Sequence, residues 1–297
     1  MRNSGVVPAF DSAGFSDLKE TEMDQDMPGV ALITGASSGI GAIYADRLAR
    51  RGYDLVLVAR NRQRLDIVRA QIARTTGRRI EVLAADLTDR TDLATVEQAL
   101  LNNSCITMLV NNAGVGATAP LLASEVDAMS RMIALNVDAI TRLTYAAAPA
   151  FAARGLGTII NVASIVAVHP ESLNGVYAGT KAFVLAFSRS LHQELGGKGV
   201  RVQVVLPGAT ATDFWGIAGL PVEQLPAELV MPAGEMVDAA LAGLDQGELV
   251  TVPSLPDPAD WKAYERARQA LFPNLSRSSA AYRYRLVRSR STALKGD

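Results

Sequence analysis

The sequence Val30–Gly41, VALITGASSGIG, places a glycine-rich turn between a short apolar run and a segment of helical pattern. The run Val30–Thr34 has the aliphatic and β-branched character of a buried strand. Glycines let a ligand approach the main chain closely, and the free N–H groups at a helix start attract an anion. This turn therefore predicts dinucleotide binding. The residues that we expect to contact its phosphates are Gly35, Ser37, Ser38, Gly39, Ile40 and Gly41.

Short apolar runs and longer helical patterns alternate along most of the chain. We expect strands at Val30–Thr34, Asp54–Ala59, Arg79–Ala85, Ile106–Asn111, Gly157–Ala163, Val200–Leu206 and Glu248–Val252. We expect helices at about 41–51, 62–74, 90–101, 125–152, 175–196 and 234–244. Continuous apolar strands joined by helices are typical of a parallel sheet covered on both faces. The sequence therefore predicts a single α/β domain over 29–253, a Rossmann-type, doubly wound, seven-stranded parallel sheet that binds ligands beyond its strand ends.

The composition excludes several other classes of protein. The chain has 297 residues, of which 49% are hydrophobic, and its net charge of −1 gives no global attraction for nucleic acid or an anionic membrane. One cysteine and two histidines exclude an internal disulfide framework and argue against a metal site. The sequence has no apolar run of about 18 residues and no signal pattern at its start. We therefore predict a cytoplasmic protein with no metal.

The two ends differ in charge from the central domain. Residues 1–28 hold two basic and six acidic side chains, and we predict a disordered acidic extension. Residues 254–297 hold nine basic and four acidic side chains and form a predicted basic extension. Tyr282 and Tyr284 lie between arginines there, which would also suit nucleic-acid binding. A solvated segment or a contact with a sister subunit fits the neutral domain better.

The end of the second predicted strand indicates which dinucleotide binds. Arg60 stands 19 residues after Gly41, where an acidic residue would accept a hydrogen bond from the ribose 2′-hydroxyl of NAD. A guanidinium suits the 2′-phosphate of NADP, to which it can donate two parallel hydrogen bonds. Arg62 and Arg64 fit a solvated helix face better. The sequence therefore favours NADP(H) over NAD(H).

Ser164, Tyr177 and Lys181 follow the fifth predicted strand. Tyr177 and Lys181 share one helix face because they are four residues apart. The ordinary pKa of a tyrosine is about 10, and an adjacent ammonium is expected to lower it, which would make Tyr177 a usable acid or base. The Ser164 hydroxyl could hold a carbonyl oxygen on which charge develops. The alternative is the edge of an amphipathic helix, and the position after the fifth strand favours catalysis.

Together these motifs resemble the short form of the short-chain dehydrogenase/reductase family, over about 225 central residues. The matching motifs are Thr34-Gly35-x-x-x-Gly39-x-Gly41, Asp86-Leu87, Asn111-Asn112-Ala113-Gly114, Asn136, Ser164, Tyr177-x-x-x-Lys181 and Pro207-Gly208-x-x-x-Thr212. Gly179-Thr180 stands where the family usually has Ala-Ser, and this departure leaves the spacing of the tyrosine and lysine unchanged.

The resemblance implies a role for each matching residue. Tyr177 would protonate the carbonyl oxygen in reduction or deprotonate the alcohol in oxidation, and Lys181 would bind the nicotinamide ribose and lower the tyrosine pKa. Ser164 would position the substrate oxygen, and Asn136 would hold a water in a proton relay through Lys181. Further cofactor contacts are implied for Asp86 and Leu87 at the adenine, Asn112, Ala113 and Gly114 at the ribose, and Pro207, Gly208, Thr210 and Thr212 toward the nicotinamide.

Three residues outside these motifs are candidates for substrate contact. His169 lies in the loop after Ser164, and a satisfied loop histidine is its alternative interpretation. Phe214 and Trp215 begin an apolar stretch that would cover the substrate in this fold, which favours an apolar carbonyl or alcohol. Packing against the sheet or a neighbouring subunit is the alternative for both.

We therefore predict an oxidoreductase that transfers a hydride between NADP(H) and a carbonyl or secondary alcohol, with no nucleic-acid or membrane partner. A 3-oxoacyl-thioester reductase and a non-catalytic NADP-sensing regulator are the alternatives. The intact Asn136, Ser164, Tyr177 and Lys181 argue against a sensor. Members of the family pair the helices equivalent to 125–152 and 175–196, so the resemblance also implies a homodimer or homotetramer.

Overall fold

The computed structural model describes residues 28–284 and contains a seven-stranded parallel sheet. Its strands are β1 Val30–Thr34, β2 Asp54–Ala59, β3 Ile80–Ala84, β4 Ile106–Asn111, β5 Gly157–Val162, β6 Val200–Val205 and β9 Val250–Thr251. Their spatial order is β3-β2-β1-β4-β5-β6-β9, which is a doubly wound, Rossmann-type arrangement. The predicted fold class is confirmed, and every predicted strand is present to within two residues at either end.

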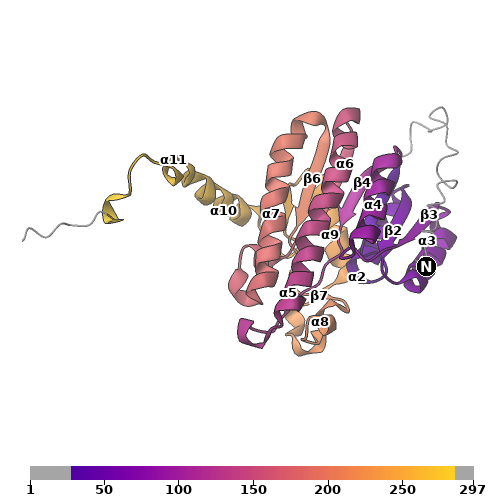
Figure 1. Cartoon of the computed structure of the whole chain (residues 1–297), viewed down its shortest axis with the longest axis horizontal. Coiled ribbons are helices and arrows are strands. Elements are labelled where there is room, and N and C mark those ends of the chain that lie inside the picture. Colours follow the sequence, from indigo (N-terminus) through magenta and orange to yellow (C-terminus); the bar gives the residue numbers. More distant parts are fainter. Residues whose placement is uncertain (1–27, 285–297) are drawn as a thin grey trace, which may run out of the picture. The chain divides into compact units, whose positions relative to one another are not determined.

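Helices cover both faces of this sheet (Figure 1). The helices α2 Gly39–Arg50, α3 Arg62–Thr76 and α9 Ala233–Asp245 pack on one face, and α4 Arg90–Asn102, α6 Ile140–Arg154 and α7 Gly175–Leu195 pack on the other. Because neither face meets solvent, every residue of β1, β4 and β5 is buried. Polar groups of the central strands can therefore reach a ligand only at the strand ends.

The sheet order reverses between β1 and β4, which is where a ligand crevice forms in open α/β sheets. Side chains join the two strand ends there. The Thr34 hydroxyl accepts hydrogen bonds from the backbone N–H groups of Asn112 and Ala113, both at 3.0 Å. The Asn112 amide in turn donates to the Thr34 carbonyl at 2.9 Å. The glycine-rich turn and the segment after β4 therefore lie against each other.

The structure divides the predicted helix 125–152 into three parts. The helix α5 spans Val126–Ile133, a π-helical turn spans Ala134–Ala139, and α6 follows. Residues 126–154 are helical throughout, so the predicted helix is present. The π-helical turn within it was not predicted, because a periodicity of 3.6 residues cannot reveal one extra residue in a turn. After β6, the chain forms the short strands β7 Thr210–Ala211 and β8 Met231–Pro232, which pair, and the short helix α8 Phe214–Ile217 between them.

The chain divides into two compact units, the first ending at Ser254 and the second beginning at Leu255. Within the predicted basic extension the structure contains two helices, α10 Pro258–Ala270 and α11 Phe272–Leu275. Asp257 caps α10 by accepting a hydrogen bond from the Ala259 N–H at 2.8 Å. The predicted acidic extension, apart from Pro28, lies outside the described residues, as does the chain after Tyr284.

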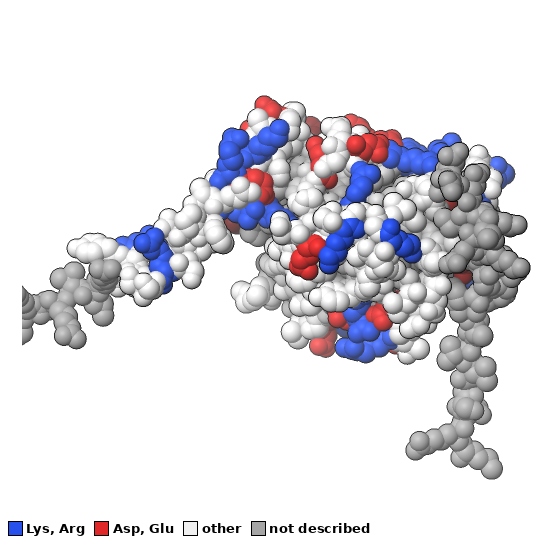
Figure 2. Space-filling view, turned by 90° about the horizontal axis from the view of Figure 1, so that it is seen from above, with Lys and Arg blue, Asp and Glu red and all other residues white. Residues whose placement is uncertain are grey.

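Surface charge, helix hydrophobicity and metal-ligand clusters in the described residues give little indication of a particular partner. Figure 2 shows a face on which basic and acidic side chains are interspersed. No helix within residues 28–284 is long and apolar enough to cross a membrane. The same residues contain no group of three or more His, Cys, Asp or Glu side chains arranged to hold a metal ion.

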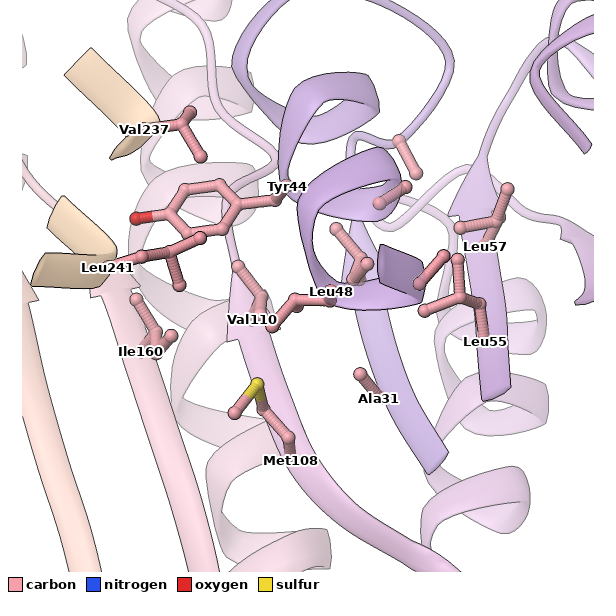
Figure 3. Close-up of a cluster of buried hydrophobic side chains, with 14 of the residues drawn as sticks. Ala31, Tyr44, Leu48, Leu55, Leu57, Met108, Val110, Ile160, Val237 and Leu241 are labelled. Atoms are coloured by element: carbon pink, nitrogen blue, oxygen red, sulfur yellow. The ribbon is translucent and has the colours of Figure 1, made fainter. Parts of the chain in front are cut away.

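Tyr44 on α2 is fully buried where α2 meets α9 and the sheet (Figure 3). Its ring packs among apolar side chains that include Val237 and Leu241. The hydroxyl has no hydrogen-bond partner among the described residues, and burial raises the pKa of Tyr44. An unpaired buried hydroxyl costs about 1–3 kcal/mol.

Removing this hydroxyl should therefore stabilise the protein. We expect Tyr44→Phe to raise the free energy of unfolding by about 1 kcal/mol, measured by urea denaturation. Tyr145→Phe, at an exposed tyrosine of α6, is the control and should change little. A less stable Tyr44→Phe variant would contradict the unpaired state of the hydroxyl.

Candidate active site

Tyr177 lies in the first turn of α7. Asn174, the residue directly before this helix, fixes where the turn begins. The Asn174 side-chain oxygen accepts hydrogen bonds from the N–H groups of Val176 and Tyr177, at 2.9 and 3.3 Å. Its amide donates to the Ala119 carbonyl at 2.7 Å. The cap therefore ties the tyrosine to the loop that follows β4. Asn174 was not among the predicted site residues, although an asparagine directly before a helical pattern is a recognisable cap signal.

Lys181 is buried one turn further along α7, and its ammonium points toward the end of β5. Its Nζ donates to the Val162 carbonyl at 2.9 Å and lies 5.8 Å from the centroid of the Tyr177 ring. Burial lowers the pKa of Lys181 to about 8. Tyr177 and Lys181, the predicted pair, therefore lie close together. The pKa of Lys181 is close to neutral pH.

The pKa of Tyr177 shifts in the direction opposite to the one expected from an adjacent ammonium. Burial raises the pKa of Tyr177 to about 12, and a hydrogen bond with the Ser164 side chain offsets only part of this rise. Burial disfavours the phenolate and the ammonium alike, so the lysine does not compensate the tyrosine. Tyr177 is therefore a protonated group near neutral pH.

Ser164 follows β5 directly and lies against the segment after β6. Its hydroxyl donates to the Pro207 carbonyl at 3.4 Å and accepts from the Val166 N–H at 3.4 Å. Both contacts are long, so the hydroxyl can exchange them for a shorter bond to a substrate oxygen. Ser164, Tyr177 and Lys181 thus meet at the carboxyl ends of β5 and β6, as predicted.

Asn136 lies in the π-helical turn and is fully buried. Its side-chain oxygen accepts from the Val115 N–H at 3.0 Å, and its amide donates to the Val115 carbonyl at 2.8 Å and to the Thr180 hydroxyl at 3.1 Å. Asn136 thus joins the π-helical turn both to the segment after β4 and to α7. A Cβ on Gly114 would lie 3.1 Å from the Asn136 oxygen and 3.5 Å from Lys181 Nζ.

The glycine-rich turn has the backbone that close ligand approach requires. Gly35 and Gly39 have positive φ angles of 67° and 52°, which side chains disfavour. Ser38 stands at the start of α2 without a side-chain capping bond, so its hydroxyl is available to a ligand. A Cβ on Gly39 would lie 3.2 Å from the Thr212 methyl group. The glycine-rich turn and the segment that carries Thr212 therefore lie directly against each other.

Arg60 lies exposed directly after β2, on the same edge of the sheet. Burial raises the pKa of Asp86, but hydrogen bonds from Thr88 and the nearby Arg60 charge outweigh it and hold this pKa below its ordinary value. Arg62 pairs with Asp66 across one helical turn at 3.4 Å, which fits the solvated face expected for it. Arg60 thus lies near Asp86, the predicted adenine contact. Leu87 is buried in the core, so its backbone alone is open to a ligand.

The three predicted substrate residues have different surroundings. The Phe214 ring packs against Tyr177, with ring centroids 5.9 Å apart. Trp215 is buried, and its indole N–H donates to the Thr210 carbonyl at 3.1 Å. His169 is exposed, and its Nδ1 lies 2.8 Å from a Glu171 carboxylate oxygen. Only Phe214 of these three packs directly on the tyrosine.

Comparisons with known proteins assign the chain to a family. The model of the short chain dehydrogenase family matches residues 29–218. The chain belongs to this family. The family resemblance seen in the sequence is therefore confirmed.

Solved structures of relatives match most of the chain. A short-chain dehydrogenase from Sphingobium yanoikuyae in complex with NADPH is 48% identical, with a TM-score of 0.84, and the match covers 86% of this chain and 100% of that one. A bulky-bulky ketone specific alcohol dehydrogenase from Comamonas testosteroni is 44% identical, with a TM-score of 0.80, covering 86% and 98%. Both matches extend well beyond the segment that the family model covers.

A curated relative matches a smaller part of the chain. The very-long-chain 3-oxoacyl-CoA reductase of Anas platyrhynchos is 36% identical over 186 residues, which are 61% of this chain and 60% of the relative. The chain thus covers less than two thirds of that protein's length.

The buried lysine predicts a pH dependence of stability. Its pKa is 10.5 in the unfolded chain and about 8 in the folded one, so the unfolded state binds more protons between these values. The Lys181 contribution to the free energy of unfolding should therefore rise from pH 8 toward pH 10. We expect the stability of the wild type relative to Lys181→Met to increase over this range in urea denaturation. A difference that stays constant with pH would contradict the burial of the charge.

Proposed function

We propose that the chain is an NADP(H)-dependent reductase of apolar ketones, which oxidises the corresponding secondary alcohols in the reverse direction. The observation that carries this proposal is the meeting of Ser164, Tyr177 and Lys181 at the carboxyl end of β5, beside apolar side chains. That apolar surrounding includes Met132, Val166 and the partly buried Val115, Leu173 and Phe214.

The residues at the β1–β4 crevice fit a nicotinamide dinucleotide. The positive φ of Gly35, the uncapped Ser38 and the free N–H groups at the start of α2 suit a pyrophosphate. Arg60 suits a 2′-phosphate, which favours NADP(H) over NAD(H), and the Sphingobium yanoikuyae relative is described with NADPH. NADPH bound there would supply the hydride. The buried Lys181 would hydrogen-bond the ribose beside the nicotinamide.

The chain's own residues would handle the substrate oxygen and its proton. The Ser164 hydroxyl holds the ketone oxygen next to the Tyr177 hydroxyl, which stays protonated near neutral pH and donates its proton as the alcohol forms. Lys181, with a pKa of about 8, can then return a proton to the tyrosine. The Asn136 side chain is fully engaged with Val115 and Thr180, so in this proposal it positions the segment after β4 against Lys181.

The charge beside the site favours an uncharged ketone over an acyl-CoA thioester. An open recess of about 550 Å³ next to α8 is lined by Thr212, Asp213, Ile217 and Glu223, among others. Its two carboxylates would repel the phosphates of a CoA substrate. The 3-oxoacyl-thioester alternative, which the curated relative of Anas platyrhynchos brings forward, is therefore less well supported.

We also propose that two copies of the chain associate through α5 and α7. Val126 and Ile133 on α5 and Phe183 on α7 expose apolar surface, and a second recess between these helices is lined by Ile133, Val137 and Val176. Burial of this surface between two copies is favourable. The molar mass in solution tests this pairing, and a monomer would contradict it. The cytoplasmic location stays a prediction.

The tyrosine tests the chemistry directly. We expect Tyr177→Phe to lower kcat for NADPH-dependent ketone reduction by a factor of about 100 or more, because the proton donor is lost. The dissociation constant of NADPH should change little. A Tyr177→Phe variant that keeps wild-type turnover would overturn the mechanism. A wild type that binds NADPH and never consumes it would favour the sensor alternative.

The arginine tests the cofactor preference. We expect Arg60→Asp to weaken NADPH binding at least tenfold more than NADH binding, because a carboxylate repels the 2′-phosphate and accepts from a 2′-hydroxyl. Arg62→Asp removes the same charge from a neighbouring residue paired with Asp66 and is the control. Fluorescence titration with both cofactors measures the ratio. Equal effects of the two substitutions would argue against a phosphate site at Arg60.

A further inference from the structure

The Phe214 side chain borders the space in front of Tyr177. Its ring centroid lies 5.9 Å from that of the tyrosine, with 46° between the ring planes. A ketone oxygen that accepts a hydrogen bond from the Tyr177 hydroxyl would lie about 2.7 Å from the hydroxyl oxygen. A substituent of that ketone on the α8 side would then meet the Phe214 ring, which packs on the proposed proton donor.

Gly116, in the segment after β4, makes room for this ring. A Cβ added to Gly116 would collide with Phe214 Cζ and lie 3.1 Å from its Cε1 and Cε2 atoms. Gly116 is not among the glycines of residues 28–284 that have a positive φ, so its backbone does not require glycine. The demand for glycine at this position therefore comes from the phenylalanine ring.

Hydrogen bonds and a ring contact hold the short helix α8, which carries Phe214, in place. The Trp215 indole donates to the Thr210 carbonyl at 3.1 Å and meets the Phe214 ring edge to face. The Thr118 hydroxyl and N–H donate to the Ala218 carbonyl at 2.9 and 3.1 Å, which joins α8 to the segment that carries Gly116. The segments that carry the ring and the glycine are therefore joined by the Thr118–Ala218 bonds, and the Trp215 bond holds α8 against β7.

We propose that Phe214 is the specificity-determining residue of the site, with Gly116 as its positioning partner. The ring bounds the space for one of the two carbonyl substituents and sets the largest group that fits there. This inference rests on the proposed ketone reduction. In this proposal Trp215 anchors α8, and Phe214 contacts the substrate.

Two ketones of different bulk test the role of the ring. Acetophenone carries one methyl and one phenyl group, whereas benzophenone carries two phenyl groups. We expect Phe214→Ala to raise the ratio of kcat/KM for benzophenone to that for acetophenone at least tenfold, because removing the ring enlarges one substituent space. An unchanged ratio in an active variant would overturn the assignment.

A double-mutant cycle tests the partnership with Gly116. We expect Gly116→Ala to change the kcat/KM ratio and to lower the melting temperature by about 2 to 4 °C, since the added methyl group displaces the ring. In the Phe214→Ala background the same substitution should do neither. Gly175→Ala, whose added Cβ would have no heavy atom within 4 Å, is the matched control on α7. Equal effects of Gly116→Ala in both backgrounds would show that the glycine serves another contact.

The wild type separates this proposal from the one on which it rests. If the wild type binds NADPH and reduces neither ketone, the proposed function fails, and the role of Phe214 as its specificity residue fails with it. If the wild type reduces the ketones and Phe214→Ala leaves their ratio unchanged, only the role of Phe214 is overturned.

Discussion

A buried chain of amide and hydroxyl groups fixes how α7 lies on the sheet, and the candidate site depends on it. The Asn111 amide donates to the Asn161 side-chain oxygen at 2.9 Å, and the Asn161 amide donates to the Ser188 hydroxyl at 2.9 Å. All three side chains are buried, so a slip of the helix would leave polar groups unpaired in the core. Ser188 lies on the same helix face as Tyr177, eleven residues further along. The register of these bonds therefore sets where the tyrosine stands relative to Ser164.

The same burial that fixes the geometry also sets the protonation of the catalytic pair. Removing both groups from water favours the neutral phenol and the neutral amine. Near neutral pH the chain alone therefore keeps Tyr177 protonated, and the pKa of Lys181, about 8, lies close to that pH. A neutral or easily neutralised lysine cannot act as a permanent counter-charge. Hydrogen bonds that favour the ammonium, such as those to ribose hydroxyls, would raise the pKa of Lys181 and couple cofactor binding to the readiness of the tyrosine.

The sequence was sufficient for the sheet and for the position of each motif, and insufficient for contacts between separate segments. Buried parallel strands leave a strong apolar pattern, and glycine turns and the tyrosine–lysine pair are local signals. The π-helical turn is not visible in the sequence, and neither is the hydrogen bond from the Val115 N–H to the Asn136 side-chain oxygen, 21 residues away. Gly116 and Phe214 are likewise 98 residues apart, so the steric demand between them appears only in the folded chain.

The edge of the sheet that holds the candidate site meets two different electrostatic demands. The basic Arg60 stands at one end, where a phosphorylated ribose would lie, and the acidic Asp213 and Glu223 line the recess beside α8 at the other. Arg64, four residues after Arg60, lies 4.0 Å from Asp213. An anionic cofactor is drawn to the basic end, while the carboxylates oppose anionic substrates at the acidic end. Under the proposed function, this charge distribution would favour NADP(H) and disfavour anionic substrates. Discrimination among neutral ketones would then depend on shape, and hence on the Phe214 ring beside Tyr177.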